Sequence, residues 1–296
     1  MRVFRVWLLC AAVAGPLSAQ VPPVAPAPAG RLVPVNGHRL WISCAGAEGP
    51  TVVVDYGGGS DGTEWRATVA ELRREARVCV YARAGYPPSE PGPFPRDAGR
   101  EADELAALLT TAAVPRPFLL VAHSLGALNA MVLAQRHRDW LTGLVVLDPP
   151  PFSWLNGTTF PAIRTGVEAT VTRVRQRVVT LRGAADSASL VRAHRSETLA
   201  SELESMFAGT ATAASAVRTL GDLPVLALAG GRPDTTAYGA DAAAFTNAWI
   251  EQARAIAALS SRGEFVLVAE SGHNVPAQVP DRVTAAVRTM LARVAR

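Results

Sequence analysis

The chain has 296 residues, of which 49% are hydrophobic, so it is long enough to bury one large core. Its formal net charge is +4, and all 29 basic residues are arginine. Because no run of arginine is interleaved with aromatic residues, the composition argues against a nucleic-acid-binding surface. The sequence leaves the oligomeric state open.

The first residues have the layout of an export signal. Two arginines precede an apolar stretch and then small residues that end at Ala19. We therefore expect residues 1–19 to be a signal peptide and the protein to be secreted or periplasmic. A retained membrane anchor is disfavoured, because the apolar stretch is too short to span a bilayer. Residues 20–30 are rich in Pro and Ala and are expected to form an extended leader.

Strand-like runs recur along the rest of the chain. Most are continuous runs of Val, Leu and Ala, a pattern typical of strands that are covered on both faces. These runs lie at 39–44, 51–56, 77–82, 118–123, 143–148, 224–230 and 264–270. Segments with helical periodicity, such as 101–112 and 280–296, lie between them. This alternation predicts an α/β fold with a mostly parallel sheet and helices on both faces.

One long interval lacks a strand-like run. It contains two amphipathic, helix-like segments at 163–183 and 187–209, and an unstructured loop of that length would be unusual. We interpret 149–222 as a helical cap inserted after the sixth strand, over the carboxyl edge of the sheet. The cap separates two parts of the core, 31–148 and 223–296.

Three residue types that covalent hydrolysis requires follow strand-like runs. Ser124, Asp234 and His273 come in the chain order nucleophile, acid, base, and strand carboxyl ends are where open α/β sheets bind ligands. A serine hydroxyl becomes a nucleophile when an imidazole takes its proton, and a carboxylate holds that imidazole in the correct tautomer. We therefore expect a catalytic triad of Ser124, Asp234 and His273. The competing interpretation of Ser124 is an ordinary helix cap.

The identity of the acid has alternatives. Asp148 ends the strand-like run before the cap and is the alternative acid, and Asp241 is a third candidate. Asp61 and Glu64 follow a glycine-rich stretch, where they are either pocket residues or solvated loop charges.

The residues around Ser124 fit a strained strand-to-helix turn. The usual pattern is Gly-x-Ser-x-Gly, and here Ala122 and Gly126 occupy the glycine positions. The backbone N–H of Leu125, at the start of the helix, is expected to face the carbonyl oxygen of a substrate. A second donor is expected from the glycine loop, Gly57–Gly59, and we assign it to the N–H of Gly58.

Metal and cofactor sites are not indicated. No pair of cysteines or histidines has metal-ligand spacing, and no Gly-x-Gly-x-x-Gly opens a helix after a strand. The absence of lysine also excludes a Walker-type phosphate loop.

Taken together, these stretches resemble the α/β-hydrolase superfamily, in its esterase-like and lipase-like branch. The resemblance covers roughly 31–296 and rests on "TVVVDYGGGSDGTEW", "RVCVYARAGYPPSE", "FLLVAHSLGALNAMVLAQRH", "LTGLVVLDPP" and "LVAESGHNVPAQVPDRVTAAV". It implies an eight-stranded sheet in the order 1-2-4-3-5-6-7-8. Two positions depart from the family pattern. Tyr56 precedes the glycines where relatives often have His, and "ARAGYP" (82–87) replaces Asp-Arg-x-Gly-Tyr-Gly.

The resemblance also bears on the two cysteines of the mature chain. Cys44 and Cys79 each lie in a strand-like run, and an exported protein meets an oxidising compartment. Either could be a buried thiol. The strand order of the family places the second and fourth strands side by side and antiparallel, which implies a Cys44–Cys79 disulfide.

These observations predict an exported serine hydrolase that cleaves a small-molecule ester through an acyl-enzyme. Lactones and thioesters react by the same chemistry. The alternatives are a peptidase, amidase or acyltransferase with the same triad, and a non-catalytic binding protein that keeps the fold. Phe152, Trp154 and Phe160, at the start of the cap, suggest an apolar pocket. Nucleic acid, a stable membrane anchor after signal cleavage, metals and cofactors are not expected.

Overall fold

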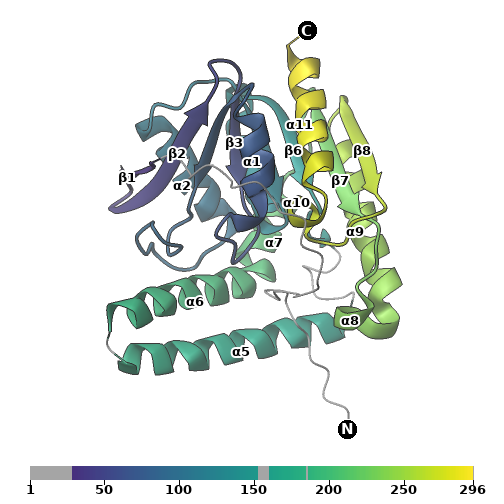
Figure 1. The fold of residues 1–296 in the computed structure, drawn as a ribbon. Coiled ribbons are helices and arrows are strands. Elements are labelled where there is room, and N and C mark those ends of the chain that lie inside the picture. The colour runs from purple at the N-terminus through teal and green to yellow at the C-terminus, as the bar shows by residue number, and fades with distance from the viewer. Residues whose placement is uncertain (1–28, 153–159, 185, 296) are drawn as a thin grey trace, which may run out of the picture.

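The computed structural model describes residues 29–152, 160–184 and 186–295, and it contains one eight-stranded sheet with helices on both faces (Figure 1). The strand order is β1-β2-β4-β3-β5-β6-β7-β8, as the family resemblance implied. Strand β2 is antiparallel to β1 and β4, and the other neighbouring pairs are parallel. The strands are β1 (Arg31–Val35), β2 (His38–Gly46), β3 (Thr51–Asp55), β4 (Arg77–Tyr81), β5 (Phe118–His123), β6 (Leu141–Leu147), β7 (Val225–Gly230) and β8 (Gly263–Val268).

The central strands are apolar along their whole length because helices cover them on both sides. Every residue of β3, β5 and β7 is buried. Strand β1 was not among the expected runs. It alternates exposed and buried residues and contains Pro34, which an edge strand tolerates because its outer N–H groups need no partner.

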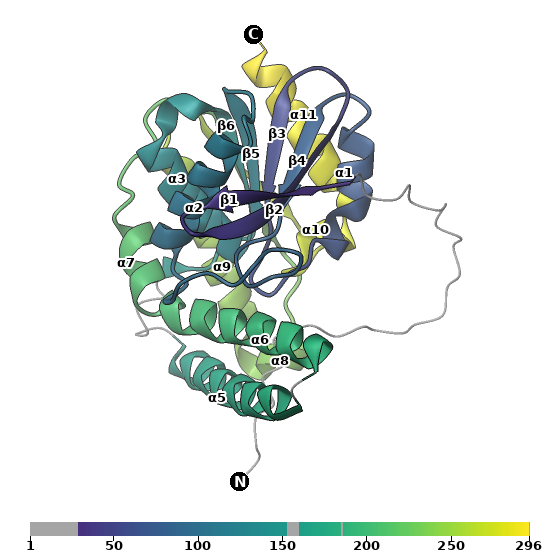
Figure 2. The same ribbon diagram turned by 90° about the vertical axis from the view of Figure 1, so that its left-hand side faces the viewer.

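Two groups of helices enclose the sheet. One face packs against α1 (Arg66–Leu72) and α11 (Pro280–Val294), and the other packs against α2 (Ala98–Thr111), α3 (Leu125–Arg136) and α9 (Ala242–Ala258), as Figure 2 shows. Each helix buries an apolar stripe with helical spacing. The shorter segments are η1 (Thr63–Trp65), η2 (Arg138–Trp140), α8 (Thr235–Tyr238), η3 (Gly239–Asp241) and α10 (Val275–Gln278).

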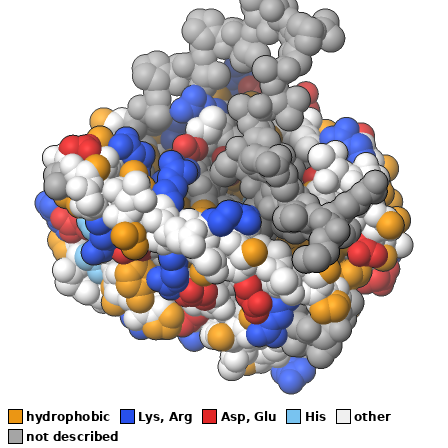
Figure 3. All heavy atoms as spheres, turned by 90° about the horizontal axis from the view of Figure 1, so that it is seen from below, with side chains coloured by type: hydrophobic (Ala, Val, Ile, Leu, Met, Phe, Trp, Pro, Cys, Tyr) orange, Lys and Arg blue, Asp and Glu red, His pale blue; other side chains and the backbone are white. Residues whose placement is uncertain are grey.

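Three further helices lie below the sheet in Figure 1, on the side where the parallel strands end. They are α5 (Pro161–Ala184), α6 (Ser187–Met206) and α7 (Gly209–Ser215), and all three lie inside the segment interpreted as a cap. Helices α5 and α6 are joined by ion pairs such as Arg182–Glu197, at 2.8 Å. Seen from the cap side, arginine and acidic side chains are interspersed over the described surface (Figure 3).

The expected disulfide is present. Cys44 and Cys79 are bonded, and they occupy directly opposite positions of the antiparallel pair β2 and β4, with their Cα atoms 4.0 Å apart. The expected signal peptide, most of the leader and Trp154 lie outside the described residues. Within the described ranges, no helix is both long enough and apolar enough to cross a membrane.

Candidate active site

Ser124 stands at the junction of β5 and α3 in a strained backbone conformation. Its φ of 53° and ψ of −124° lie outside the regions that residues with a Cβ normally adopt. Its own N–H donates to the carbonyl of Leu147 at 2.9 Å. Gly126 has no room for a side chain, because a Cβ there would lie 2.4 Å from the carbonyl oxygen of Tyr56. Ala122, at the other glycine position of the motif, is fully buried and its methyl group is accommodated.

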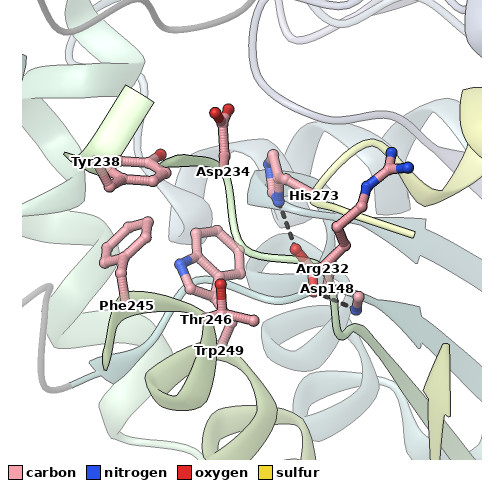
Figure 4. Close-up of a pocket in the computed structure, with 9 residues that line it drawn as sticks. Asp148, Arg232, Asp234, Tyr238, Phe245, Thr246, Trp249 and His273 are labelled. Atoms are coloured by element: carbon pink, nitrogen blue, oxygen red, sulfur yellow. Dashed lines mark hydrogen bonds and ion pairs between the residues drawn. The ribbon is translucent and has the colours of Figure 1, made fainter. Parts of the chain in front are cut away.

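His273 is hydrogen-bonded to Asp148. The expected partner, Asp234, instead caps a short helix. Nδ1 of His273 lies 2.6 Å from Oδ2 of Asp148, as the dashed line in Figure 4 marks. The second oxygen, Oδ1, accepts the N–H of Gly230 at 2.9 Å. Burial raises the pKa of the Asp148 carboxyl above its ordinary value, and the hydrogen bond to His273 opposes that rise. Both carboxylate oxygens are therefore engaged.

Local hydrogen bonds explain why Asp234 is not the partner of His273 that the sequence had predicted. Its carboxylate accepts the N–H groups of Thr236 and Ala237 at 3.1 and 2.9 Å, so it caps the short helix α8. Asp241 is exposed at the end of η3. Asp148 directly follows β6 and has a φ of 47°, and an aspartate at the end of a strand-like run was the signal in the sequence that pointed to it.

The two charged residues after the glycine loop lie beside that loop. Asp61 is exposed and lies 3.9 Å from Arg195 of α6, and Glu64 accepts a hydrogen bond from the hydroxyl of Ser60. Neither carboxylate is among the residues that line the pocket described below.

His123 has a contact that the sequence did not indicate. Its Nε2 lies 2.9 Å from the backbone carbonyl of His273, so this nitrogen donates. Burial and the neighbouring His273 lower the pKa of His123 to about 3, which keeps the ring neutral. This bond connects the turn that contains Ser124 directly to the loop that contains His273.

The two residues that are expected to donate their backbone N–H groups, Gly58 and Leu125, lie close together in the structure. A Cβ placed on Gly58 would lie 3.3 Å from Cδ2 of Leu125, so the glycine loop and the start of α3 are in contact. Gly57 is equally close to the elbow, because a Cβ there would lie 3.5 Å from the Cβ of Ser124. Gly58 is exposed, whereas Gly57 is buried. The two backbone N–H groups therefore belong to adjacent segments beside Ser124.

A pocket lined by aromatic side chains opens beside His273 (Figure 4). The ring of Trp249 lies 4.5 Å from the imidazole, and Phe245 lies 5.8 Å from Trp249, both measured between ring centroids. Phe160 packs edge-on against Phe245 at 5.4 Å, so one of the aromatic residues at the start of the cap does reach this cluster. The pocket is lined by Asp148, Gly230, Arg232, Asp234, Tyr238, Phe245, Thr246, Trp249 and His273.

A buried ion cluster contacts the glycine loop, and no motif in the sequence predicted it. Arg83 is 5% exposed and contacts Asp55 at 3.0 Å and Glu202 of the cap at 3.0 Å. Burial raises the pKa of Asp55 to about 6. Burial, followed by the charge of Glu202, raises the pKa of Glu101 to about 8. Within the described ranges, no three potential ligands converge to hold a metal ion.

Comparison with known proteins agrees with this architecture. The model of the alpha/beta hydrolase family matches residues 57–286. A pimeloyl-[acyl-carrier protein] methyl ester esterase from Vibrio atlanticus is 32% identical over 104 residues, which cover 35% of this chain and 38% of the relative. The curated relatives are thus matched over less than half of their length.

Solved structures show the same fold over nearly the whole chain. A thermophilic esterase from Thermogutta terrifontis has a TM-score of 0.67 at 22% identity, with 90% of this chain and 99% of the other covered. An enol-lactonase from Burkholderia xenovorans has a TM-score of 0.61 at 20% identity, with 88% and 100% covered. The family match and the shared fold lead to one conclusion: the chain belongs to the alpha/beta hydrolase family.

Proposed function

We propose that the protein is a serine hydrolase that cleaves a carboxylic ester through an acyl-enzyme. The observation that carries the proposal is the strained elbow of Ser124, whose preceding residue His123 bonds to the backbone of His273, the residue that is paired with Asp148. Strain of this kind persists where the surrounding structure fixes it, and it exposes the hydroxyl at the carboxyl edge of the sheet. The esterase and lactonase of the same fold support an acyl-transfer reaction, as does the esterase among the curated relatives.

The proposed chemistry assigns one task to each group. His273 takes the proton of Ser124 as the hydroxyl oxygen attacks the ester carbonyl, and it then gives that proton to the departing alcohol. Asp148 holds the imidazole with its Nδ1–H toward the carboxylate and stabilises the imidazolium. The N–H groups of Gly58 and Leu125 stabilise the oxyanion. Water, activated by His273, then releases the acid.

The substrate preference follows from the pocket. Aromatic side chains beside His273, among them Trp249 and Phe245, favour an apolar acyl or alcohol group. We choose an ester because it is the least demanding bond for this set of groups. Lactones and thioesters are accessible to the same chemistry, and an amide or an acyl acceptor other than water remains the alternative.

The decisive test is covalent labelling combined with a substrate panel. A fluorophosphonate probe is expected to label the wild type, to leave Ser124→Ala unlabelled, and to label the control Ser215→Ala normally, because Ser215 is exposed on the cap. p-Nitrophenyl esters of increasing chain length would be compared with a lactone, a thioester and an anilide. Absence of labelling in folded wild type would favour a binding protein, and faster cleavage of the anilide would favour an amidase.

The export of the protein is also a proposal. It is supported by the signal-like residues at 1–19 and by the Cys44–Cys79 disulfide. The full chain produced in a Gram-negative host is expected in the periplasm or medium, with Gln20 as its first residue. Recovery of uncleaved protein from the cytoplasm would contradict this.

A further inference from the structure

One face of the cap helix α6 rests on the glycine loop. Arg195 Nη2 donates to the carbonyl of Gly59 at 2.8 Å. Thr198 packs so closely against the turn after β4 that a Cβ on Gly85 would lie 1.8 Å from its hydroxyl oxygen. The residues of this face have the spacing of one helical stripe and are Arg195, Thr198, Leu199 and Glu202.

Two side chains fix the peptide planes on either side of Gly58. Arg83 Nη2 donates to the carbonyl of Gly57 at 2.8 Å, and the N–H of Gly59 donates to the hydroxyl of Tyr86 at 3.1 Å. In a trans peptide the C=O and N–H point in opposite directions. Holding the Gly57 carbonyl toward Arg83 therefore turns the Gly58 N–H away from the protein interior. These two contacts, together with the N–H of Ser60, which donates to the Gly57 carbonyl at 3.3 Å, set the direction of the proposed oxyanion donor.

Both of these side chains bond to the same carboxylate of the cap. Glu202 accepts the Nε–H of Arg83 at 3.0 Å through one oxygen and the hydroxyl of Tyr86 at 2.6 Å through the other. The exposed fractions of Glu202, Tyr86 and Arg83 are 1%, 3% and 5%. Hydrogen bonds to a charged group in such a water-poor place are short and strongly directional.

We propose that Glu202 is a positioning residue for the oxyanion hole. The carboxylate touches no reacting atom; it acts through Arg83 and Tyr86 to hold the Gly58 N–H in its productive direction. The cap thereby takes part in completing the hole, through Glu202 and through Arg195, which donates to the carbonyl of Gly59. This inference rests on the proposed function, since it takes Gly58 as an oxyanion donor.

The test is the isosteric Glu202→Gln variant, which retains only part of the hydrogen bonding to Arg83 and Tyr86. Loss of a complete oxyanion donor lowers kcat by about a hundredfold to a thousandfold, so a misdirected donor is expected to lower it roughly tenfold to a hundredfold. KM for a p-nitrophenyl ester should stay within about twofold, because the substrate carbonyl is less dependent on the hole than the oxyanion is. Affinity for a trifluoromethyl ketone, whose adduct with serine carries an oxyanion, should fall in parallel with kcat.

The matched control is Glu104→Gln. Glu104 is also buried in the ion cluster, 4% exposed, but it is paired with Arg96 at 2.6 Å and lies near His38. This change also removes a buried carboxylate that is paired with an arginine, but one that lies away from the glycine loop. It is expected to alter stability without altering kcat or ketone affinity.

A second variant keeps the inference testable if Glu202→Gln does not fold. Tyr86→Phe removes only the hydroxyl that joins the Gly59 N–H to Glu202 and should give the same split between kcat and KM. Two failures are distinguishable. If wild type neither labels nor hydrolyses any substrate, the proposed function fails and this inference fails with it. If wild type is active and Glu202→Gln and Tyr86→Phe are no more impaired than Glu104→Gln, only the role of Glu202 is overturned.

Discussion

Nδ1 of His273 and Oδ2 of Asp148 lie 2.6 Å apart, although 125 residues separate them in the chain. Asp148 directly follows β6, and His273 follows β8. The pair therefore joins the ends of two strands that are separated by β7 in the sheet. Asp148 is 3% exposed, whereas the side chain of His273 is 49% exposed, so the hydrogen bond joins a buried carboxylate to an imidazole that solvent and substrate can reach.

The first prediction separates the two candidate acids. Asp148→Asn is expected to lower kcat by up to about ten-thousandfold, because the amide N–H would face Nδ1 and favour the wrong tautomer of His273. Asp234→Asn should retain near wild-type kcat, since Asn caps a helix about as well as Asp. Initial rates on a p-nitrophenyl ester, with circular dichroism to confirm folding, decide which aspartate is the acid. Greater damage from Asp234→Asn would restore Asp234 as the acid.

The second prediction concerns strain at the elbow. Backbone conformations of this kind cost roughly 1–3 kcal/mol for a residue with a Cβ, and glycine is free of much of that cost. Ser124→Gly and Ser124→Ala should both be inactive. We expect Ser124→Gly to be more stable than Ser124→Ala by about 1 kcal/mol in denaturant unfolding. Equal stabilities would mean that the strain at Ser124 is negligible in solution.

The third prediction is a fall in stability as pH rises. The pKa of Glu101 is raised from 4.5 to about 8 in the folded state, so the folded protein keeps a proton that the unfolded chain loses above its ordinary pKa. The free energy of unfolding should therefore decrease between about pH 4.5 and pH 8, and Asp55, with a pKa of about 6, acts in the same direction at lower pH. Urea unfolding at pH 5 and pH 8 measures this difference.

The Glu101→Gln variant isolates the contribution of Glu101. The amide is always neutral, so the difference between pH 5 and pH 8 should be smaller than in wild type. Glu251→Gln removes an exposed carboxylate, with a 73% exposed side chain, and is the control for the loss of one acidic group. An undiminished pH dependence in Glu101→Gln would show that other groups cause it.

The fourth prediction concerns the Cys44–Cys79 disulfide. The two cysteines are 35 residues apart, and closing a loop of that length stabilises a fold by about 4 kcal/mol in the loop-entropy model. Reduction with dithiothreitol, or the Cys44→Ala/Cys79→Ala variant, should lower Tm while folded enzyme keeps its kcat, because the bond joins β2 and β4 away from His273. Two reactive thiols in the unfolded, unreduced protein would refute the pairing.

The sequence was sufficient for the features that local pattern and chain order determine. Continuous apolar runs located most of the strands, and Ser124 and His273, which follow β5 and β8, stay the predicted nucleophile and base. Strand β1 was missed because Pro34 and alternating exposure at a sheet edge weaken the apolar signal.

The remaining features depend on where distant segments meet. The choice between Asp148 and Asp234 depended on loop geometry after β7, where two backbone N–H groups engage Asp234. The contact between Arg83 and Glu202 joins residues 119 positions apart, and no motif records such a pairing. The bond between His123 and the carbonyl of His273 joins residues 150 positions apart, and no local pattern indicates it.

Asp234 caps the short helix α8, and this arrangement affects which residues near the pocket can vary. Because Asp148 holds the imidazole, the segment after Gly230 carries no hydrogen bond to the ring, yet Arg232 and Tyr238 from it line the pocket. Residues 233–239 can therefore change in length and chemistry with little effect on the His273–Asp148 pair, whereas the N–H of Arg232 donates to the carbonyl of Ser271 at 2.8 Å and supports the loop that carries His273. A combinatorial library restricted to this segment is the natural starting point for changing the substrate of the proposed esterase.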